Sequence, residues 1–320
     1  MFDASLATWV AAALPAAALA LAWAIDARFR EAPDAWHPVA WFGRLAAPLG
    51  LAARALAPRG ALLAGALAWA VLLALVIALA LGLQALLAQA PWWLALPLLA
   101  LALKPTLAWR MLRDEVAAVE AALVRSLDEG RAQLARLCSR DVRQLDEAGV
   151  RETAIETLAE NFNDSLVAPL FWFVVAGLPG AWAWRAVNTL DAMWGYRGAW
   201  EWAGKCAARA DDLLAWLPAR LSAWLLWPAR TDWRTLRREA ARTPSPNGGW
   251  PMAAMALRLG VRLGKPGVYA LNAGAPAPTA AALAQALTIG RGAARRAFGL
   301  ALLAALTASL ARAALTGALA

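Results

Sequence analysis

The sequence predicts an all-α, polytopic membrane protein with about four to six membrane segments, some broken or re-entrant, plus a small cytoplasmic helical subdomain. Its 320 residues are 62% hydrophobic and 17% charged, whereas a soluble domain is about 45–50% apolar and about 25% charged. The mean hydropathy is +0.51. Apolar stretches of about 20 residues, long enough to cross a bilayer, recur along the chain. We therefore treat residues 1–320 as one integral membrane domain.

The candidate spans fall into two classes. Those that are long and nearly uninterrupted are Ala4–Ile25, Ala61–Leu83, Leu86–Leu103 and Ala297–Leu319. Two others are damaged: residues 165–184 contain Pro169, Gly177, Pro179 and Gly180, and residues 213–228 are short and contain Pro218 and Arg220. Irregular backbone at membrane depth is tolerated where it lines a protein cavity, so we expect these two segments to be broken or re-entrant.

The charged segments predict the topology. Residues 104–164 hold 9 basic and 12 acidic residues, and leucines recur there at helical spacing. We expect a cytoplasmic helical insertion, with breaks at Gly130 and Gly149. Residues 229–296 hold 11 basic and 2 acidic residues and are expected to form a basic cytoplasmic loop region. The positive-inside rule then predicts a multi-pass membrane protein whose main polar loops are cytoplasmic.

Several function classes are excluded. The net charge of +9 belongs mainly to arginines beside apolar spans, which set topology, and no zinc-finger or RNA-recognition pattern is present, so we expect no nucleic-acid partner. One histidine and two cysteines cannot form a Cys/His zinc site. No P-loop, dinucleotide-binding turn or serine-hydrolase elbow occurs. The 19 tryptophans suit interfacial belts in contact with membrane lipid.

An acidic stripe precedes the first damaged segment. Glu152, Glu156 and Glu160 stand at i, i+4 and i+8 and share one helix face, and Asp164 continues the register. Like charges at this spacing repel, so we expect a positive group opposite, either arginine or a hard cation such as Mg²⁺. A solvated helix face remains an equal alternative. Asn161 adds an amide to the stripe.

A second polar group follows the same segment. Arg185, Asn188 and Asp191 lie at i, i+3 and i+6 on one helix face. They could bind a polar ligand or form an interhelical hydrogen-bond network, and the spacing favours neither. The same alternatives hold for Arg209, Asp211, Asp212 and Arg220. All these groups would lie near the cytoplasmic interface only if one or both damaged segments do not cross fully.

Three further features are weaker. The turn at residues 245–251 (SPNGGWP) could form an anion-binding nest from its backbone N–H groups, although most such loops are only turns. His37 is the single histidine, and Lys104 ends an apolar stretch, where lysines commonly reach towards water. A structural role is the alternative for both residues.

Taken in order, these segments resemble the CobD/CbiB family of cobalamin biosynthesis, the adenosylcobinamide-phosphate synthases. The resemblance covers roughly residues 21–270. It rests on residues 37–43 (HPVAWFG), 104–112 (KPTLAWRML), 156–164 (ETLAENFND), 168–171 (APLF), 185–191 (RAVNTLD), 196–197 (YR), 208–213 (ARADDL), 218–221 (PARL), 245–251 (SPNGGWP) and 253–255 (AAM).

The resemblance implies an integral membrane ligase of bacterial corrin-ring maturation. Such an enzyme would join a carboxylate of adenosylcobyric acid to (R)-1-aminopropan-2-ol or its O-phosphate, forming an amide, with ATP as co-substrate and Mg²⁺. The corrinoid and the aminopropanol phosphate would be its substrates. Its assembly could be a homo-oligomer or a complex with other corrinoid-assembly enzymes.

We assign candidate roles on this basis. The catalytic candidates are Glu156, Glu160, Asn161, Asp164, Asn188 and Asp191. The candidates for substrate or phosphate binding are His37, Lys104, Arg185, Tyr196, Arg197, Arg209, Arg220, Ser245, Asn247 and Trp250, since a guanidinium fork matches phosphate geometry. The metal candidates are Glu160, Asp164, Asp191, Asp211 and Asp212.

The chain departs from the family pattern at several positions. Residues 28–33 (RFREAP) replace an expected Gly-Asp-Pro, and residues 161–165 (NFNDS) replace Asn-Thr-Ser-Asp-Gly. Thr243 replaces a histidine and Met252 a glutamate, which bears on the catalytic role of that loop. The competing hypotheses are a transporter of a charged metabolite, built on broken helices, and a non-catalytic membrane signalling protein. Internal repeats would favour transport, and no convincing two-fold repeat is present.

Overall fold

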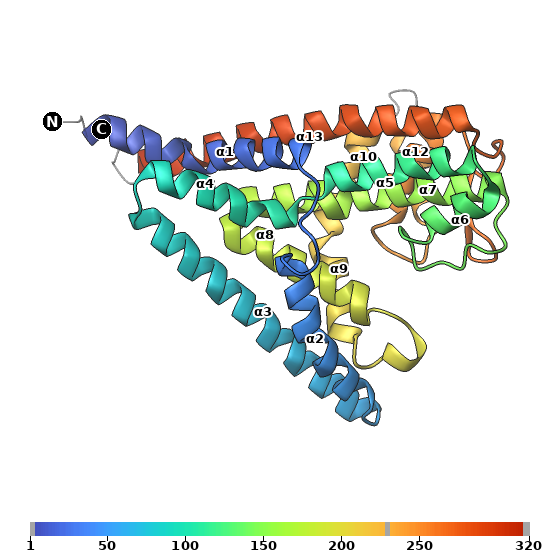
Figure 1. The fold of residues 1–320 in the computed structure, drawn as a ribbon, viewed down its shortest axis with the longest axis horizontal. Coiled ribbons are helices and arrows are strands. Elements are labelled where there is room, and N and C mark those ends of the chain that lie inside the picture. Colours follow the sequence, from blue (N-terminus) through green and yellow to red (C-terminus); the bar gives the residue numbers. More distant parts are fainter. Residues whose placement is uncertain (1–3, 228–230, 316–320) are drawn as a thin grey trace. The chain divides into compact units, whose positions relative to one another are not determined.

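The computed structural model describes residues 4–227 and 231–315, with side chains for 13–227 and 231–311. Within these ranges nearly all regular structure is helical (Figure 1). The helices are α1 (Ala4–Arg28), α2 (Pro38–Arg54), α3 (Pro58–Gln89), α4 (Trp92–Leu103), η1 (Lys104–Thr106), α5 (Trp109–Leu123), α6 (Leu127–Leu134), α7 (Glu147–Phe162), η2 (Asn163–Val167), α8 (Ala168–Trp194), η3 (Gly198–Trp200), α9 (Lys205–Leu214), α10 (Trp216–Leu226), α11 (Trp233–Ala240), α12 (Gly249–Leu259) and α13 (Ala280–Leu315).

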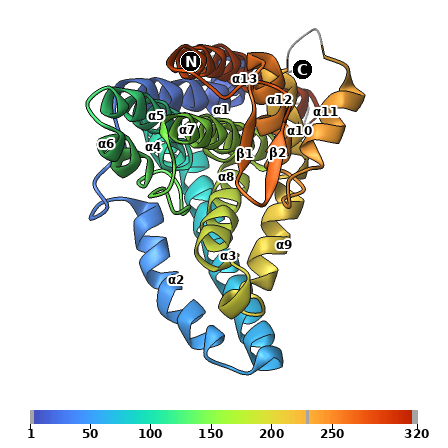
Figure 2. The ribbon, with the colours of Figure 1, turned by 90° about the vertical axis from the view of Figure 1, so that its right-hand side faces the viewer.

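One short hairpin interrupts this helical pattern. Strands β1 (Leu263–Lys265) and β2 (Tyr269–Leu271) pair antiparallel, with Leu263 opposite Leu271 (Figure 2). A two-stranded ribbon has little stability alone, and this one packs on α7 and α12.

Helices of membrane-spanning length, as predicted, are confirmed in the described part of the chain. Four helices there are long and apolar enough to cross a bilayer: Pro58–Gln89, Trp92–Leu123, Glu147–Trp194 and Ala280–Ala311. The protein is an all-α polytopic membrane protein. These helices overlap four of the predicted spans, and α1 covers a fifth, Ala4–Ile25. The side chains of residues 4–12 lie outside the described part, and so do residues 316–319 of the last predicted span.

One predicted segment boundary was wrong. Helix α3 continues to Gln89, and the turn to α4 falls at Pro91, because proline cannot continue the helical hydrogen-bond ladder. The segment 213–228 is broken, as predicted: α9 ends at Leu214, and α10 has 11 residues. At 1.5 Å per residue α10 is about 16 Å long, about half the hydrocarbon thickness.

The chain falls into two compact units. Unit 1 comprises the described parts of Met1–Ala108, Ala168–Leu214 and Phe298–Ala320; unit 2 comprises those of Trp109–Val167 and Ala215–Ala297. Most of the charged segment 104–164 and the basic segment 229–296 therefore belong to the same unit. The basic segment, apart from residues 229 and 230 outside the described part, contains α11, α12, the hairpin and the start of α13 rather than an irregular loop.

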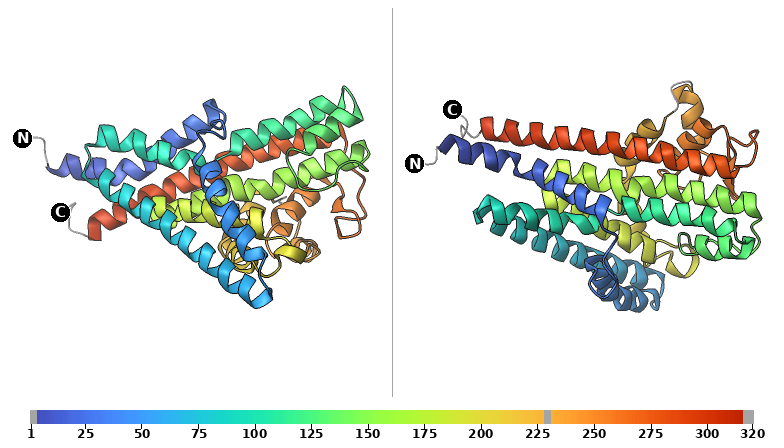
Figure 3. Two further views of the ribbon diagram at one scale, coloured as in Figure 1. Left: turned by 60° about the horizontal axis from the view of Figure 1, so that its bottom comes forward. Right: turned by 45° about the horizontal axis from the view of Figure 1, so that its top comes forward.

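Unit 1 is built on close contacts between small residues. Ala46 of α2, Leu72 of α3 and Trp194 of α8 belong to one buried cluster, and α2 packs along α3 (Figure 3). A side chain at Gly50 would collide with the Trp194 indole, and one at Gly65 with the Ala203 carbonyl. Small residues let membrane helices approach this closely.

Helix α8 is broken inside its apolar stretch, as predicted for residues 165–184. Ala176 and Gly177 have non-helical backbone angles, with Gly177 at φ 64° and ψ −153°. Pro179 supplies no N–H to continue the ladder. The Leu178 N–H instead donates to Gln84 Oε1 of α3 at 3.3 Å, so a side chain from a neighbouring helix satisfies a backbone group at the break.

Gly177→Ala is expected to destabilise the protein by about 1–3 kcal/mol, because that backbone region is essentially restricted to glycine. A Cβ there would also lie 2.7 Å from Gln84 Oε1. The apparent Tm in detergent measures the effect. Gly82→Ala in α3 is the matched control, since nothing lies within 4 Å of its new Cβ and alanine favours the helix. Equal Tm values for the two variants would contradict the strain argument.

Unit 2 surrounds α7. This helix packs against α5, α6, α12 and β1, and Ile155 and Leu158 are fully buried. The predicted helix breaks at Gly130 and Gly149 were wrong. Gly130 lies within α6, where it makes room for Leu123, and Gly149 lies in the first turn of α7, where its N–H donates to the N-cap Asp146 at 2.7 Å.

Candidate functional site

The acidic stripe on α7 divides into buried and exposed members. Glu156 and Glu152 are buried, whereas Glu160 is exposed. Arg140 Nη2 lies 2.9 Å from Glu156 Oε2, and Arg262 Nη2 lies 3.6 Å from Glu152 Oε2. The positive groups expected opposite the stripe are therefore arginines at its first two members.

Glu156, a predicted catalytic residue, is held in a buried network. Arg140 also donates to Thr153 Oγ1 at 2.8 Å and to the Gly264 carbonyl at 3.3 Å. Arg140 therefore links the segment between α6 and α7 to both α7 and the hairpin. A buried carboxylate that loses its cation is costly, so Arg140 has a structural role towards Glu156. Glu160 is the member of the stripe that retains access to solvent.

Tyr269 joins the neighbourhood of these glutamates. Burial raises the pKa of the Tyr269 hydroxyl most. The negative charge of Glu156 raises it further, and Glu160 has a smaller effect in the same direction. The hydroxyl therefore stays protonated and available as a donor, and it lies 3.8 Å from Met252 Sδ. Tyr269 and Arg140 could not be predicted as part of this site, since neither has a local signal in the sequence. The substituted Met252 is buried beside this tyrosine.

The loop at residues 245–251 approaches Glu160 through a glycine. A Cβ on Gly248 would lie 2.6 Å from Glu160 Oε1, and one on Gly249 would collide with the Ala240 carbonyl and the Thr243 hydroxyl. The first turn of α12 therefore needs both glycines to pack against α7 and the end of α11. Thr243 Oγ1 lies 2.9 Å from the Ser245 carbonyl, so the residue that replaces an expected histidine helps to fix the loop.

The predicted anion nest in this loop is filled by its own side chain. Ser245 Oγ accepts hydrogen bonds from the N–H groups of Asn247 at 3.2 Å and Gly248 at 3.0 Å. These two N–H groups are therefore engaged within the loop, and the substrate-binding role of Ser245 stays a prediction.

Arg220 is built into the same loop. Its guanidinium lies between the rings of Trp216 and Trp250, 4.6 and 4.7 Å from their centroids. It donates to Asn247 Oδ1 at 2.6 Å and to the Pro246 carbonyl at 3.1 Å. Burial lowers the pKa of this guanidinium, but arginine remains charged. The predicted substrate ligands Arg220, Asn247 and Trp250 thus support one another and hold the loop.

Amides continue the polar surface at the end of α7. Asn161 Nδ2 donates to the Thr157 carbonyl at 3.1 Å. Asn163 is buried, donates to Asp164 Oδ1 at 2.8 Å and accepts from Ser222 Oγ at 3.2 Å. Asn163 and Asp164 lie in η2, a single π-helical turn, and such turns are frequent at functional sites.

In unit 1, Asn188 of α8 and Asp211 of α9 meet directly. Asn188 Nδ2 donates to Asp211 Oδ1 at 3.2 Å, and Asp191 lies on the same face of α8, where its side chain covers Gly195. Asp212 lies 3.8 Å from Arg209. Burial raises the pKa of Asp212, and the Arg209 charge opposes that shift. Arg209, Tyr196 and Arg197 are exposed.

His37 and Lys104 belong to a partly buried charge network in unit 1. Lys104 Nζ contacts Asp26 Oδ1 at 3.0 Å, the Glu31 carboxylate and the Leu107 carbonyl. His37 caps α2 by accepting from the Val39 N–H through Nδ1, and its Nε2 lies 3.1 Å from Glu31 Oε2. Their role in substrate binding stays a prediction, and both side chains are engaged within the unit. Arg185 likewise donates to the Thr106 carbonyl at 2.7 Å.

Glu31 is expected to make the stability of unit 1 sensitive to acid. Burial alone would raise the pKa of Glu31, but the bonds from His37 and Lys104 outweigh it and lower the pKa. A lowered native pKa contributes stability above the unfolded value, about 4.3, and that stability is lost as the pH falls through the native pKa. The apparent Tm of Glu31→Gln should therefore lie below that of wild type at pH 7, with the gap closing towards pH 3. A constant gap would contradict this linkage.

The predicted metal ligands are divided between the two units. Glu160 and Asp164 belong to unit 2, and Asp191, Asp211 and Asp212 to unit 1. In the described part of the chain, no three His, Cys, Asp or Glu side chains come together as a metal-binding group. Mg²⁺ often takes only one or two protein carboxylates and completes its shell with phosphate oxygens and water. The exposed Glu160 in unit 2 could supply such a partial set, and so, separately, could the aspartates of α9 in unit 1.

A family model described as CobD/Cbib protein matches residues 19–308, which is most of the chain. The chain belongs to the CobD/Cbib family. The resemblance found in the sequence motifs is confirmed. No solved structure matches the chain.

Curated relatives of this CobD/Cbib chain bear the same family name. It is 43% identical over 256 residues to the probable cobalamin biosynthesis protein CobD of Pyrococcus abyssi, covering 78% of this chain and 83% of that protein. It is 44% identical over 248 residues to the cobalamin biosynthesis protein CobD of Chromobacterium violaceum, covering 72% and 76%. For the CobD of Rhodobacter capsulatus the identity is 39% over 291 residues, covering 85% and 89%.

Proposed function

We propose that this protein is an enzyme of cobalamin biosynthesis that joins adenosylcobyric acid to (R)-1-aminopropan-2-ol or its O-phosphate, with cleavage of ATP. The observation that supports this most is membership of the CobD/Cbib family across residues 19–308, which include the polar groups of both units. The product would be adenosylcobinamide or its phosphate.

The proposed reaction has two steps, phosphorylation of the carboxylate and displacement of phosphate by the amine. A carboxylate oxygen of the corrinoid attacks the γ-phosphorus of ATP, and ADP leaves. The amine nitrogen of the aminopropanol then attacks the acyl carbon, phosphate leaves, and a proton passes from nitrogen to a base. When bound, Mg²⁺ would neutralise charge on the transferring phosphoryl group.

The residues suited to these steps are those that keep solvent access. Glu160 presents a carboxylate beside the Gly248 backbone, where it could hold Mg²⁺ or accept the amine proton. Asp211, oriented by Asn188, is a second candidate for the metal. Arg197 and Arg209 are exposed and suit phosphate oxygens. Arg220, Glu156 and Lys104 act through packing and ion pairs in this proposal.

Product analysis tests the proposal. Membranes containing the protein are incubated with adenosylcobyric acid, ATP, Mg²⁺ and either the amino alcohol or its O-phosphate, and the corrinoid products are measured by mass spectrometry. We expect an ATP-dependent product whose mass identifies the amine donor. An unchanged adenosylcobyric acid pool with both donors, in membranes shown to contain folded protein, would contradict the proposal.

We further propose a bacterial inner-membrane location, with the charged segments of unit 2 in the cytoplasm, where ATP is available. Cys138 lies in unit 2 and is a free, partly exposed thiol. In a Cys206→Ser background, a membrane-impermeant thiol reagent should label Cys138 only after the cells are lysed. Labelling in intact spheroplasts would place this segment outside.

The native mass of the purified protein would show whether it is a homo-oligomer.

A further inference from the structure

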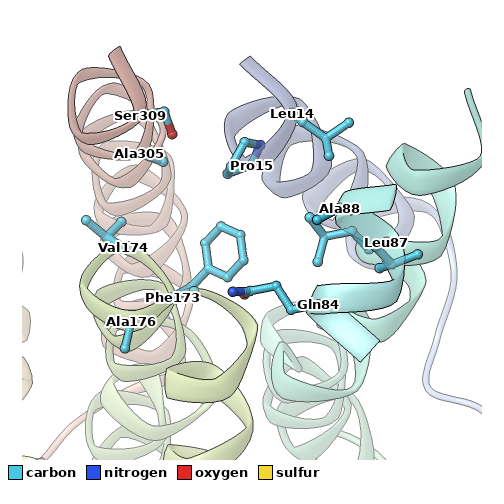
Figure 4. A pocket seen from close by; sticks show the side chains of 12 residues that line it. Leu14, Pro15, Gln84, Leu87, Ala88, Phe173, Val174, Ala176, Ala305 and Ser309 are labelled. Atoms are coloured by element: carbon cyan, nitrogen blue, oxygen red, sulfur yellow. The ribbon is translucent and has the colours of Figure 1, made fainter. Parts of the chain in front are cut away.

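Unit 1 contains a cavity of about 420 Å³ that no step of the proposed reaction uses. Its lining comes from α1, α3, α4, α8 and the last turns of α13 (Figure 4). Most of that lining is apolar, including Leu14, Leu87, Leu99, Phe173 and Val174. The volume lies within the range of about 300–1,000 Å³ typical of small-molecule sites.

Two polar side chains, Ser309 and Gln84, line this cavity, and the amide of Gln84 has a fixed orientation. Gln84 Oε1 accepts the Leu178 N–H at 3.3 Å, and only the oxygen of an amide can accept. The Nε2 group must therefore point away from Leu178, and Figure 4 shows the amide directed across the cavity towards Phe173. Among residues 13–227 and 231–311, whose side chains are described, no hydrogen-bond acceptor contacts Nε2. A donor without a partner is costly in hydrocarbon.

The position of the cavity along α3 indicates its depth in the membrane. Gln84 lies five residues before the end of α3 at Gln89, about 8 Å along the helix axis. Trp92 and Trp93 follow immediately and are 57% and 63% exposed, as expected for an interfacial aromatic belt. The amide therefore lies just below the interface, where the ester groups of phospholipids meet their acyl chains.

We propose that this cavity binds one phospholipid, with an acyl chain against the apolar lining and an ester carbonyl accepting a hydrogen bond from Gln84 Nε2. Helices α3, α4 and α8 lie within candidate membrane spans, so acyl chains are the apolar groups that surround the cavity. The unpaired amide donor selects an occupant with an acceptor at this depth. The site is independent of amide synthesis.

Native mass spectrometry of the full-length protein tests this assignment. The protein is delipidated in detergent and titrated with a diester phosphatidylglycerol or with its diether analogue, which lacks the ester carbonyls. Wild type should bind one diester molecule about fivefold more tightly than the diether, the fold-change expected for one ordinary hydrogen bond. Gln84→Leu should bind both lipids equally.

Two bulky substitutions on α3 distinguish lipid binding in the cavity from lipid contact elsewhere on the helix surface. Ala88 lines the cavity and Ala85 does not, and both are exposed on α3. Ala88→Phe should weaken binding of the diester lipid at least about tenfold, whereas Ala85→Phe should leave it unchanged. This pair leaves Gln84 intact, so it remains informative if Gln84→Leu fails to fold.

Three results would overturn the proposal: equal lipid binding by Ala88→Phe and Ala85→Phe, no preference of wild type for the diester, or displacement of the phospholipid by equimolar free oleate. The last result would assign the cavity to a fatty acid.

Discussion

Glu160→Gln is expected to lower the rate of amide synthesis by about 100-fold or more, the usual effect of removing one charged or polar group that acts on the transition state. Glu160 is the member of the acidic stripe with an exposed carboxylate, and it faces the backbone of the Gly248 turn. Its loss removes a negative charge without opening a cavity, so the apparent Tm should change little. Initial rates and Tm measured on the same preparation check both parts.

Glu147→Gln is the matched control for this variant. Glu147 lies in the first turn of the same helix, is exposed, and pairs with Arg151 at 3.2 Å. An exposed pair contributes about 0–1 kcal/mol, so this variant should keep wild-type activity. If Glu160 binds Mg²⁺, Glu160→Gln should also need more Mg²⁺ for half-maximal activity. Full activity of Glu160→Gln at limiting Mg²⁺ would exclude Glu160 from the site.

The membrane fold could be predicted because span length and composition are local properties. The α8 break was predicted for the same reason, since Gly177 and Pro179 mark it in the sequence. The end of α3 was placed too early, because residues 84–89 favour a helix and only Pro91 terminates it. The short α10 was harder to place: its leucines and tryptophans have the composition of a span but not the length.

The roles within the acidic stripe could not be predicted from spacing. Glu152, Glu156 and Glu160 have the same helical register, and their differences arise from partners elsewhere in the chain. Arg140 lies 16 positions before Glu156, and Arg262 lies 110 positions after Glu152. Only the fold brings these arginines to α7 and leaves the third carboxylate exposed.

The roles of residues in the loop at 245–251 could not be predicted from the sequence either. Its composition predicted a turn, and the turn is present, but its N–H donors are occupied by Ser245 Oγ. Arg220 was expected to meet a phosphate, and instead lies between two tryptophan rings. The motif predicted the turn, but only the fold shows which of its residues build the loop.

Arg140→Met is expected to destabilise the protein by about 3–5 kcal/mol, because it leaves the buried Glu156 carboxylate without its cation. The ion pair spans 2.9 Å, and its side chains are 15% and 4% exposed. For a chain of this size the apparent Tm in detergent should fall by roughly 10 °C. Arg143→Met is the matched control: its pair with Asp141 lies at the surface, with side chains 81% and 56% exposed, so its Tm should match wild type.

The double variant Arg140→Met/Glu156→Met distinguishes a structural from a catalytic Glu156. Replacing a whole buried ion pair by apolar side chains is often neutral or stabilising, so the double variant should recover much of the Tm lost by Arg140→Met. If Glu156 serves stability alone, the recovered protein should also synthesise the amide at a rate within about threefold of wild type. A restored Tm with abolished synthesis would return Glu156 to the catalytic residues. An unrestored Tm would show that the contacts of Arg140 with Thr153 and the Gly264 carbonyl stabilise unit 2 more than the ion pair does.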